Sequence, residues 1–241
     1  NILSGSDVGK ERKDNQDRFY CFDDNKWGNG VSTFIAIADG MGGLNDGGKA
    51  AEIALDCIKQ NLSDIDFKNP FLTNDFIFEV LYNSTIKANE EVCSYSKKNN
   101  TQMGTTLSFG ILIRDTFYFS HVGDTRIYSI KESSFKKNNY SIEQLTVDDN
   151  VEGSSNILTQ HIGSEKEISP FLGKFKISKT SFLLFASDGL YGLVEDQKIA
   201  EFFAIYKGDE LAKKLIDEAN NNGGSDNITL VIYEPKVIEY I

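Results

Sequence analysis

The sequence contains little that would divide it into separate units. Only 3 of its 241 residues are proline, and no proline-rich run or glycine/serine tract interrupts it, so nothing marks a linker. Hydrophobic residues make up 40% of the chain, which is enough to fill one large core. The composition therefore predicts a single domain over residues 1–241.

Sulfur and imidazole ligands are also scarce. The three cysteines, Cys21, Cys57 and Cys93, are odd in number, far apart and embedded in apolar stretches. This pattern predicts reduced core residues in a cytoplasmic protein, and argues against a disulfide framework or a zinc site. The two histidines, His121 and His161, are too few and too scattered for a histidine-rich metal site.

Clustered positive charge and long apolar runs are missing as well. The net charge is −11, which argues against nucleic acid as a partner because phosphate backbones are bound by clustered Lys and Arg. The acidic balance indicates either a solvated surface or aspartates that converge on cations, and the two explanations are compatible. No apolar run approaches the roughly 20 residues of a membrane span, so no membrane insertion is expected.

Strand and helix signals alternate in blocks along the chain. β-Branched or aromatic runs bounded by turn residues predict seven strands, over residues 18–22, 31–38, 106–113, 116–122, 126–130, 181–186 and 228–233. Apolar residues at helical spacing predict helices over 49–62, 75–95, 196–203 and 209–219. The pattern predicts an α+β fold in which two packed antiparallel sheets have helices on their outer faces.

Two loop regions stand out between these elements. Residues 111–128 are typical of consecutive antiparallel strands, with tight connections at Arg114-Asp115 and Gly123-Asp124. Residues 148–170 form a polar, irregular stretch rich in Ser, Glu and Asn. Loops of that length are usually functional or mobile.

Four aspartates occupy comparable places at the ends of apolar strands: Asp39, Asp124, Asp188 and Asp226. A single Asp-Gly pair usually marks an ordinary turn, but here Asp39-Gly40 and Asp188-Gly189 each end a continuous apolar run. Two unit charges about 4 Å apart repel by roughly 4 kcal/mol at an effective dielectric near 20. If these carboxylates converge, a cation or a proton must accompany them. Ligands that are all oxygen favour Mg²⁺ or Mn²⁺ over Zn²⁺.

Seven motifs, in order along almost the whole chain, resemble those of the metal-dependent type 2C protein serine/threonine phosphatases. The Gly-Met-Gly-Gly form and the compact length resemble the bacterial branch of that family. The motifs are Arg12-x-x-Asn15-Gln16-Asp17, Ala38-Asp39-Gly40-Met41-Gly42-Gly43, Gly104-Thr105-Thr106, Val122-Gly123-Asp124-Thr125-Arg126, Leu145-Thr146-x-Asp148, Ala186-Ser187-Asp188-Gly189 and Gly224-Ser225-Asp226-Asn227-Ile228-Thr229.

The resemblance implies a four-layer α/β/β/α sandwich, in which two antiparallel sheets are flanked by helix pairs and a binuclear metal site lies at one edge. It implies that Asp17 and Asp39 hold metals, with Asp39 bridging, and that the backbone carbonyl of Gly40 binds the first metal. Asp188 and Asp226 would bind the second metal. The expected cofactors are Mn²⁺ or Mg²⁺, two per chain.

The resemblance also implies a third, weaker cation at Asp124 and a substrate-phosphate contact from Arg12. A guanidinium presents a planar fork that takes two phosphate oxygens at once. With Arg12, Asp17 and Asp39 as the catalytic residues, the implied reaction is hydrolysis of phosphoserine and phosphothreonine in proteins by a metal-activated water. The expected partners are phosphorylated substrates of a serine/threonine kinase, and the expected state is a monomer.

Other positions in the motifs are predicted to support the metal ligands and not to bind metal themselves. Thr105 and Thr106 are predicted to be buried strand residues that support the site. Asn227 is predicted either to orient Asp226 or to act only in a turn. Gln16 stands where many members of the family have Glu, a departure that bacterial members often share.

The remaining polar candidates concern local packing and proton donation. Arg126 is expected to position Asp124 or to pack locally, and His121 to be a satisfied interior residue. Met41 stands where many eukaryotic relatives have a histidine that is a candidate general acid, and a thioether cannot donate a proton. A metal-bound water is then the expected donor, with His161 as the side-chain alternative.

Two alternative functions fit much of the same sequence. One is a binding module that kept the fold and lost the reaction, which is disfavoured because all four aspartates of the binuclear site and Arg12 are present. The other is a phosphatase for small phosphomonoesters or for one dedicated regulator. The polar stretch 148–170 corresponds to the family's flap but matches it loosely, so no substrate preference is implied.

Overall fold

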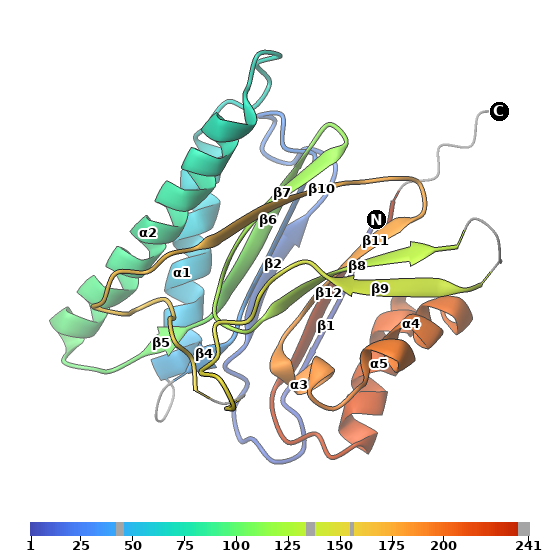
Figure 1. The fold of residues 1–241 in the computed structure, drawn as a ribbon. Helices are drawn as coiled ribbons and strands as arrows, with labels where there is room; N and C mark the ends of the chain where they lie inside the picture. Colours follow the sequence, from blue (N-terminus) through green and yellow to red (C-terminus); the bar gives the residue numbers. More distant parts are fainter. Residues whose placement is uncertain (42–45, 134–137, 155–156, 236–241) are drawn as a thin grey trace.

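Two five-stranded antiparallel sheets pack face to face in the computed structural model, which describes residues 1–41, 46–133, 138–154 and 157–235 (Figure 1). The first sheet has the order β1 (Ile2–Asp7), β12 (Ile228–Tyr233), β11 (Ser181–Ala186), β8 (Arg126–Glu132) and β9 (Tyr140–Gln144). The second has the order β10 (Phe171–Lys176), β7 (Thr116–Val122), β6 (Leu107–Ile113), β3 (Thr33–Ala38) and β2 (Arg18–Phe22). A small two-stranded sheet pairs β4 (Gly40–Met41) with β5 (Gly104–Thr105).

Helices cover the outer face of each sheet (Figure 1). The long pair α1 (Asp46–Ser63) and α2 (Asn74–Asn99) packs on the second sheet. The pair α4 (Asp196–Ile205) and α5 (Asp209–Asn221), with the one-turn α3 (Asp188–Tyr191), packs on the first. Local sequence sets the ends of α2: the Thr73 side chain accepts a hydrogen bond from Phe76 N, and Asn100 adopts a left-handed conformation with φ 52°.

The central strands are continuous apolar runs because both of their faces are buried. In β3, Phe34, Ala36 and Ala38 face the α1/α2 core. Ile35 and Ile37, between them in sequence, belong to the core between the two sheets. This alternation is the two-residue period of a strand, and it confirms the predicted α+β sandwich of two antiparallel sheets flanked by helices.

All seven predicted strands and all four predicted helices are present, with ends that differ by at most a few residues. Six elements were not predicted from the sequence: β1, β9 and β10, the short pair β4 and β5, and the one-turn helix α3. β9 and β10 alternate between exposed and partly buried residues over most of their length, so they lack the continuous apolar signal of the central strands. That residues 1–241 form one domain stays a prediction.

The structure differs from the prediction of consecutive antiparallel strands over residues 111–128. β6 and β7 form the predicted hairpin, with Arg114 in a left-handed conformation at φ 58°. After Gly123, however, the chain crosses to the other sheet, where β8 pairs with β11 and β9. Gly123 has φ 104°, a conformation that glycine adopts without strain and that permits the change of direction.

The three cysteines agree only in part with the prediction of reduced core residues. Cys21, Cys57 and Cys93 are free, as predicted. Each is half-buried, not fully enclosed in a core. Cys21 packs at the edge of the core between the sheets and Cys57 at the edge of the α1/α2 core.

None of the helices in the described ranges combines the length and the apolar character that a membrane span requires.

Candidate metal centre

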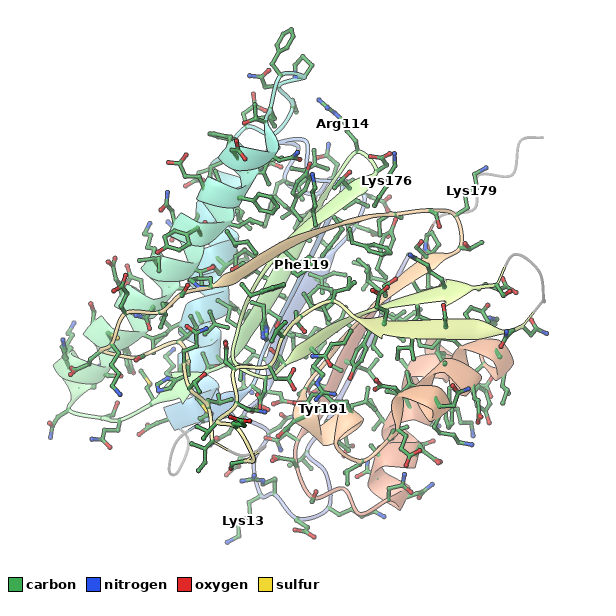
Figure 2. All side chains as sticks on the ribbon, in the orientation of Figure 1. Lys13, Arg114, Phe119, Lys176, Lys179 and Tyr191 are labelled. Carbon is green, nitrogen blue, oxygen red and sulfur yellow. The ribbon has the colours of Figure 1, made fainter. Side chains whose placement is uncertain are left out.

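The predicted acids come from both sheets and lie around one end of the sandwich. Asp17 precedes β2 and Asp39 follows β3 in the second sheet, whereas Asp226 precedes β12 and Asp188 opens α3 after β11 in the first. Asp124 lies in the crossing between β7 and β8. Figure 2 shows Tyr191 of α3 at this end of the sheets, and Arg114 and Lys176 at the opposite end.

Strand register explains why these acids are neighbours. Arg18 of β2 pairs with Ala38 of β3, so Asp17 and Asp39, one residue beyond each, leave the same end of the sheet. In the other sheet the Ser187 N–H donates to Thr229 O at 3.0 Å, which places the start of α3 beside the start of β12. The ends of the two sheets thus present acids toward one another.

Asp17 is almost completely buried, with 3% of its surface exposed. Its Oδ2 accepts a hydrogen bond from Ser187 Oγ at 2.8 Å. Burial is the main cause that raises the pKa of Asp17 to about 7, and the charge of Asp188 adds to it, while hydrogen bonds from Thr229 and Ser187 oppose it. A buried carboxyl group beside other acids binds either a proton or a cation at neutral pH.

The neighbouring acids behave in the same way. Desolvation raises the pKa of Asp39 well above its ordinary value, and the charges of Asp17, Asp188, Asp226 and Asp124 raise it further. Asp39 keeps some exposed surface at the rim of the site, so it combines a desolvated carboxyl group with access from outside. The five acids therefore act as one electrostatic cluster.

The same two causes act at Asp188 and Asp124. Burial raises the pKa of Asp188, followed by the charge of Asp226. Burial also raises the pKa of Asp124 to about 7, followed by the charges of Asp188 and Asp148.

Two carboxylate oxygens in this cluster support cation binding. Asp17 Oδ1 and Asp188 Oδ1 are buried and have no hydrogen-bond partner within the described residues. Buried polar atoms are nearly always paired in proteins, so each unpaired one needs an explanation. No three Asp, Glu, His or Cys side chains in the described ranges already surround one point as a complete ligand set. The fit to a hard divalent cation rests instead on the all-oxygen chemistry, the shared charge and the two unpaired oxygens.

Both Asp-Gly pairs are closely packed against other backbone, unlike ordinary turns. A Cβ on Gly40 would lie 2.3 Å from the carbonyl of Gly47 in α1. A Cβ on Gly189 would lie 2.0 Å from Asn227 O. Only glycine allows these approaches, which hold the backbone beside Asp39 and Asp188 against α1 and the start of β12.

Supporting contacts confirm part of the weaker interpretations. Thr106 Oγ1 accepts a hydrogen bond from Asp39 N, and Thr105 Oγ1 donates one to Asp39 O, both at 2.9 Å. The two buried threonines thus hold the Asp39 backbone from both sides.

Asn227 acts differently from the simple prediction. Its backbone N–H donates to Asp226 Oδ1 at 2.8 Å. Its side chain instead joins the N-terminal loop, where it donates to Val8 O and Asp14 O and accepts from Gln16 N. The Asn227 side chain therefore does not orient Asp226, and its amide fastens residues 8–16 to the start of β12.

Arg12 lies at the rim of the cluster. Its Nη2 contacts Asp226 Oδ2 at 2.7 Å, and its side chain is 57% exposed. The hydrogen bond and charge of Asp226 raise the pKa of Arg12, so the guanidinium stays positive at all working pH values. A cation that takes Asp226 as a ligand would compete with this ion pair and release the guanidinium toward an incoming anion.

Two functional contacts were not predicted from sequence. Ser187 stands in a quoted motif, but nothing in the sequence indicated that its hydroxyl would hydrogen-bond Asp17. Tyr191 was overlooked altogether, although its hydroxyl donates to Asp124 O at 2.9 Å and its ring lies against Arg126. A polar aromatic residue three positions after Asp188 was the available signal.

The histidines have different environments. His121 is fully buried, with Nδ1 2.8 Å from Ser108 Oγ and Nε2 3.1 Å from Val147 O, which confirms the satisfied interior role. His161 lies beside Gly104, whose Cβ would be 2.7 Å from its Nδ1. His161 therefore borders β5, the strand that pairs with β4 through Gly104 and Met41. Gly42 and Gly43 of that motif lie outside the described residues.

Taken together, these contacts bring Asp17, Asp39, Asp124, Asp188 and Asp226 to one end of the sandwich, with Gly40 beside them. Such a site can bind divalent cations through carboxylate and carbonyl oxygens. Arg12 at its rim can receive a dianionic group that approaches them. The arrangement is suited to hydrolytic chemistry on a phosphate ester.

Comparisons with known proteins agree with this arrangement. The profile of the family described as Protein phosphatase 2C matches residues 5–216. The protein phosphatase PhpP of Streptococcus pneumoniae is 29% identical over 240 residues, which cover 94% of each chain.

Solved structures are similar over nearly the full length. The serine/threonine phosphatase of S. agalactiae superposes with a TM-score of 0.82 at 27% identity, and the match covers 98% of this chain and 99% of that one. The catalytic domain of the serine/threonine phosphatase PstP, in complex with two manganese ions, has a TM-score of 0.78 at 24% identity, with 96% of each chain covered.

Proposed function

The chain belongs to the protein phosphatase 2C family, and from this premise we infer that it is a metal-dependent phosphatase that hydrolyses phosphoserine and phosphothreonine in proteins. The observation that carries the inference is the cluster of five aspartates at one end of the sandwich, with two buried carboxylate oxygens that lack a partner in the described residues. The intact acid set and Arg12 argue against a binding module that has lost the reaction.

In this proposal Asp17, Asp39 and the backbone carbonyl of Gly40 would hold the first cation, and Asp39 would also contribute to the second. Asp39 suits a bridging position because its carboxyl group feels the charges of the four other acids. The second site consists of Asp188 and Asp226, which belong to the opposite sheet. Mn²⁺ or Mg²⁺ fits both, because every ligand is oxygen. The two manganese ions of the PstP complex support the count of two.

Asp124 is assigned to a third, weaker cation. Its carboxyl group is near Asp188, whose charge raises its pKa, and it lies on the crossing between the sheets, two residues after the end of β7. When bound, the divalent cations lower the pKa of water and stabilise negative charge on the transferring phosphoryl group.

The chain's own residues bind and orient the substrate. Arg12 binds the phosphate of the phosphoserine or phosphothreonine once its ion pair with Asp226 is released. The Thr105 and Thr106 hydroxyls hold the Asp39 backbone in place, and Ser187 holds Asp17. Fixed ligands need little reorganisation as charge develops, and this lowers the barrier.

The leaving alkoxide needs a proton. Met41 cannot supply it, and His161 is the side-chain candidate because its ring lies beside Gly104 of β5, the strand that pairs with the Met41 strand β4. We assign the proton to water at the site and keep His161 as the alternative to be tested.

The substrates in this proposal are proteins phosphorylated by a serine/threonine kinase, and the enzyme acts in the cytoplasm as a monomer. The deciding experiment is hydrolysis of p-nitrophenyl phosphate and of a phosphothreonine peptide in Mn²⁺, Mg²⁺, Ca²⁺ and EDTA. Activity on both substrates in Mn²⁺ or Mg²⁺, and none in EDTA, supports the proposal. Full activity in EDTA after extensive dialysis contradicts it, and activity restricted to the small ester contradicts the protein substrate.

A further inference from the structure

The crossing between β7 and β8, residues 123–125, is held from the side of the flap by a pair of hydrogen bonds. Gly123 N donates to Asp149 Oδ2 at 2.8 Å. In return, Asp149 N donates to Gly123 O at 2.8 Å. The base of the flap and the segment that carries Asp124 are therefore joined directly.

Arg126 adds an ion pair between the same two segments. Its Nε lies 3.1 and 3.0 Å from the two carboxylate oxygens of Asp148, and its Nη2 lies 2.7 Å from Oδ2. Gln144 Nε2 donates to Asp148 Oδ1 at 2.7 Å. The side chains of Arg126 and Asp148 are only 23% and 17% exposed, so this pair is better defined than a surface ion pair.

Tyr191 joins these contacts to α3. Its hydroxyl donates to the Asp124 backbone carbonyl at 2.9 Å, and the Arg126 guanidinium carbon lies 3.7 Å from the centre of its ring. Tyr191 is three residues after Asp188, on the same helical turn. One side chain thus contacts the segment that carries Asp124 and the cation that holds the flap base, from the helix that carries Asp188.

We propose that Tyr191 is a positioning residue for Asp124, and that together with Arg126 it couples the flap base to the weaker cation site. The inference rests on the proposed function, because it takes Asp124 to bind the third cation. Tyr191 acts through the backbone: the hydroxyl fixes the Asp124 carbonyl, and the direction of the Asp124 carboxyl group follows from that fixed backbone. The stacked ring keeps Arg126 in line with Asp148.

A role in packing alone does not account for the hydroxyl. A phenylalanine would fill the same space and would stack equally on a guanidinium. The atom that distinguishes tyrosine from phenylalanine is the one that touches the Asp124 segment.

Tyr191→Phe tests the hydroxyl, with Tyr118→Phe as the matched control. Tyr118 also has a hydrogen-bonded hydroxyl, 2.7 Å from Asn74 Oδ1 at the start of α2, away from the acids. Mn²⁺ binding is measured by electron paramagnetic resonance of the free ion, without turnover. We expect the weak-class Kd of Tyr191→Phe to rise roughly threefold to tenfold, as for the loss of one hydrogen bond, with the two tight classes and the control unchanged.

Amide hydrogen exchange in saturating Mn²⁺ gives a second readout. Tyr191→Phe and Arg126→Lys, which loses the planar fork, should both speed exchange at Gly123 and Asp149, and Tyr118→Phe should not. Unchanged weak-class binding and unchanged exchange in Tyr191→Phe overturn the inference, as does equal weakening of all cation classes. If the wild type binds only two cations per chain, the third site of the proposed function fails and the inference falls with it. If it binds none, the proposed function itself fails.

Discussion

Without bound cations, the free energy of unfolding should decrease as pH rises. Asp124→Asn isolates one source of this decrease. The ordinary pKa of the carboxyl group is 3.8, and burial with the nearby acids raises it to about 7 in the folded protein. The folded state therefore keeps a proton that the unfolded chain releases between these values. The contribution of this group to the free energy of unfolding is greatest below about pH 4 and disappears as pH rises through about 7.

The size of the effect follows from the two pKa values. The folded and unfolded pKa values of Asp124 differ by about 3. Each tenfold change in proton affinity corresponds to about 1.4 kcal/mol, so the free energy of unfolding changes by about 4 kcal/mol across the whole range. Between pH 5 and pH 8 the expected loss is about 3 kcal/mol, because part of the range lies below pH 5. Asp17, whose pKa is also about 7, adds to the slope of the wild type, but its contribution is not simply additive because both groups feel Asp188.

The assay is urea unfolding in EDTA from pH 5 to pH 8, followed by the fluorescence of Trp27. This is the only tryptophan of the sequence, and its ring lies 4.6 Å from Phe22 and 5.0 Å from Phe34 in the core beneath α1. Asp124→Asn cannot titrate, so its stability should gain on the wild type by about 3 kcal/mol over this range. In saturating Mn²⁺ the wild-type slope should reverse, because cations bind the deprotonated acids.

Asp115→Asn is the matched control. Asp115 is exposed and paired with Lys176, and that contact lowers its pKa. It is fully ionised throughout the range, so its replacement should give the same difference from wild type at every pH. If Asp124→Asn in EDTA also differs from the wild type by the same amount at pH 5 and pH 8, the reasoning about the acid cluster is refuted.

The remaining predictions concern catalysis and packing. Asp39→Asn should reduce kcat to below about a tenth of wild type while circular dichroism stays unchanged, and a higher residual rate would remove Asp39 from the site. Arg12→Ala should raise KM about tenfold with a smaller loss in kcat, and Arg12→Lys should recover only part of the lost substrate binding. An unchanged KM would contradict the assignment of Arg12 as the residue that binds the phosphate. His161→Ala should affect aryl and phosphoserine substrates alike, whereas a loss near a hundredfold for the alkyl ester alone would make His161 the general acid. Gly189→Ala should lower the free energy of unfolding by about 2 kcal/mol or more in urea, because its Cβ would lie 2.0 Å from Asn227 O, and an unaltered urea midpoint would contradict the close packing.

The sequence predicted the elements whose physical signal is local. Strands such as β3 and β11 are buried on both faces, so their apolar runs are continuous in the sequence. The edge strand β10 has its side chains largely toward solvent, and nothing in its sequence announces that it pairs with β7. The change of sheet at Gly123 depends on a backbone conformation, which the sequence does not reveal among the many turns glycine can form.

The site shows the same limit. Four aspartates were noted at strand ends and the family resemblance added Asp17, and the structure brings these five acids to one end of the sandwich. The contacts that hold them could not be predicted, because they join residues far apart in the chain. Ser187 and Asp17 are 170 residues apart in sequence, and Tyr191 and Asp124 are 67 apart. Such pairs become visible only when the packing of the two sheets is known.

The order of strands in the first sheet has a consequence for folding during translation. β12, the last strand of the described chain, lies between β1 and β11, and it begins two residues after Asp226. While a ribosome still holds this segment, β1 has no neighbour to pair with in that sheet. The second sheet and the α1/α2 pair are already complete in the nascent chain once β10 has emerged. A chain cut before β12 would therefore leave β1 without its partner strand and would lose the strand that begins beside Asp226.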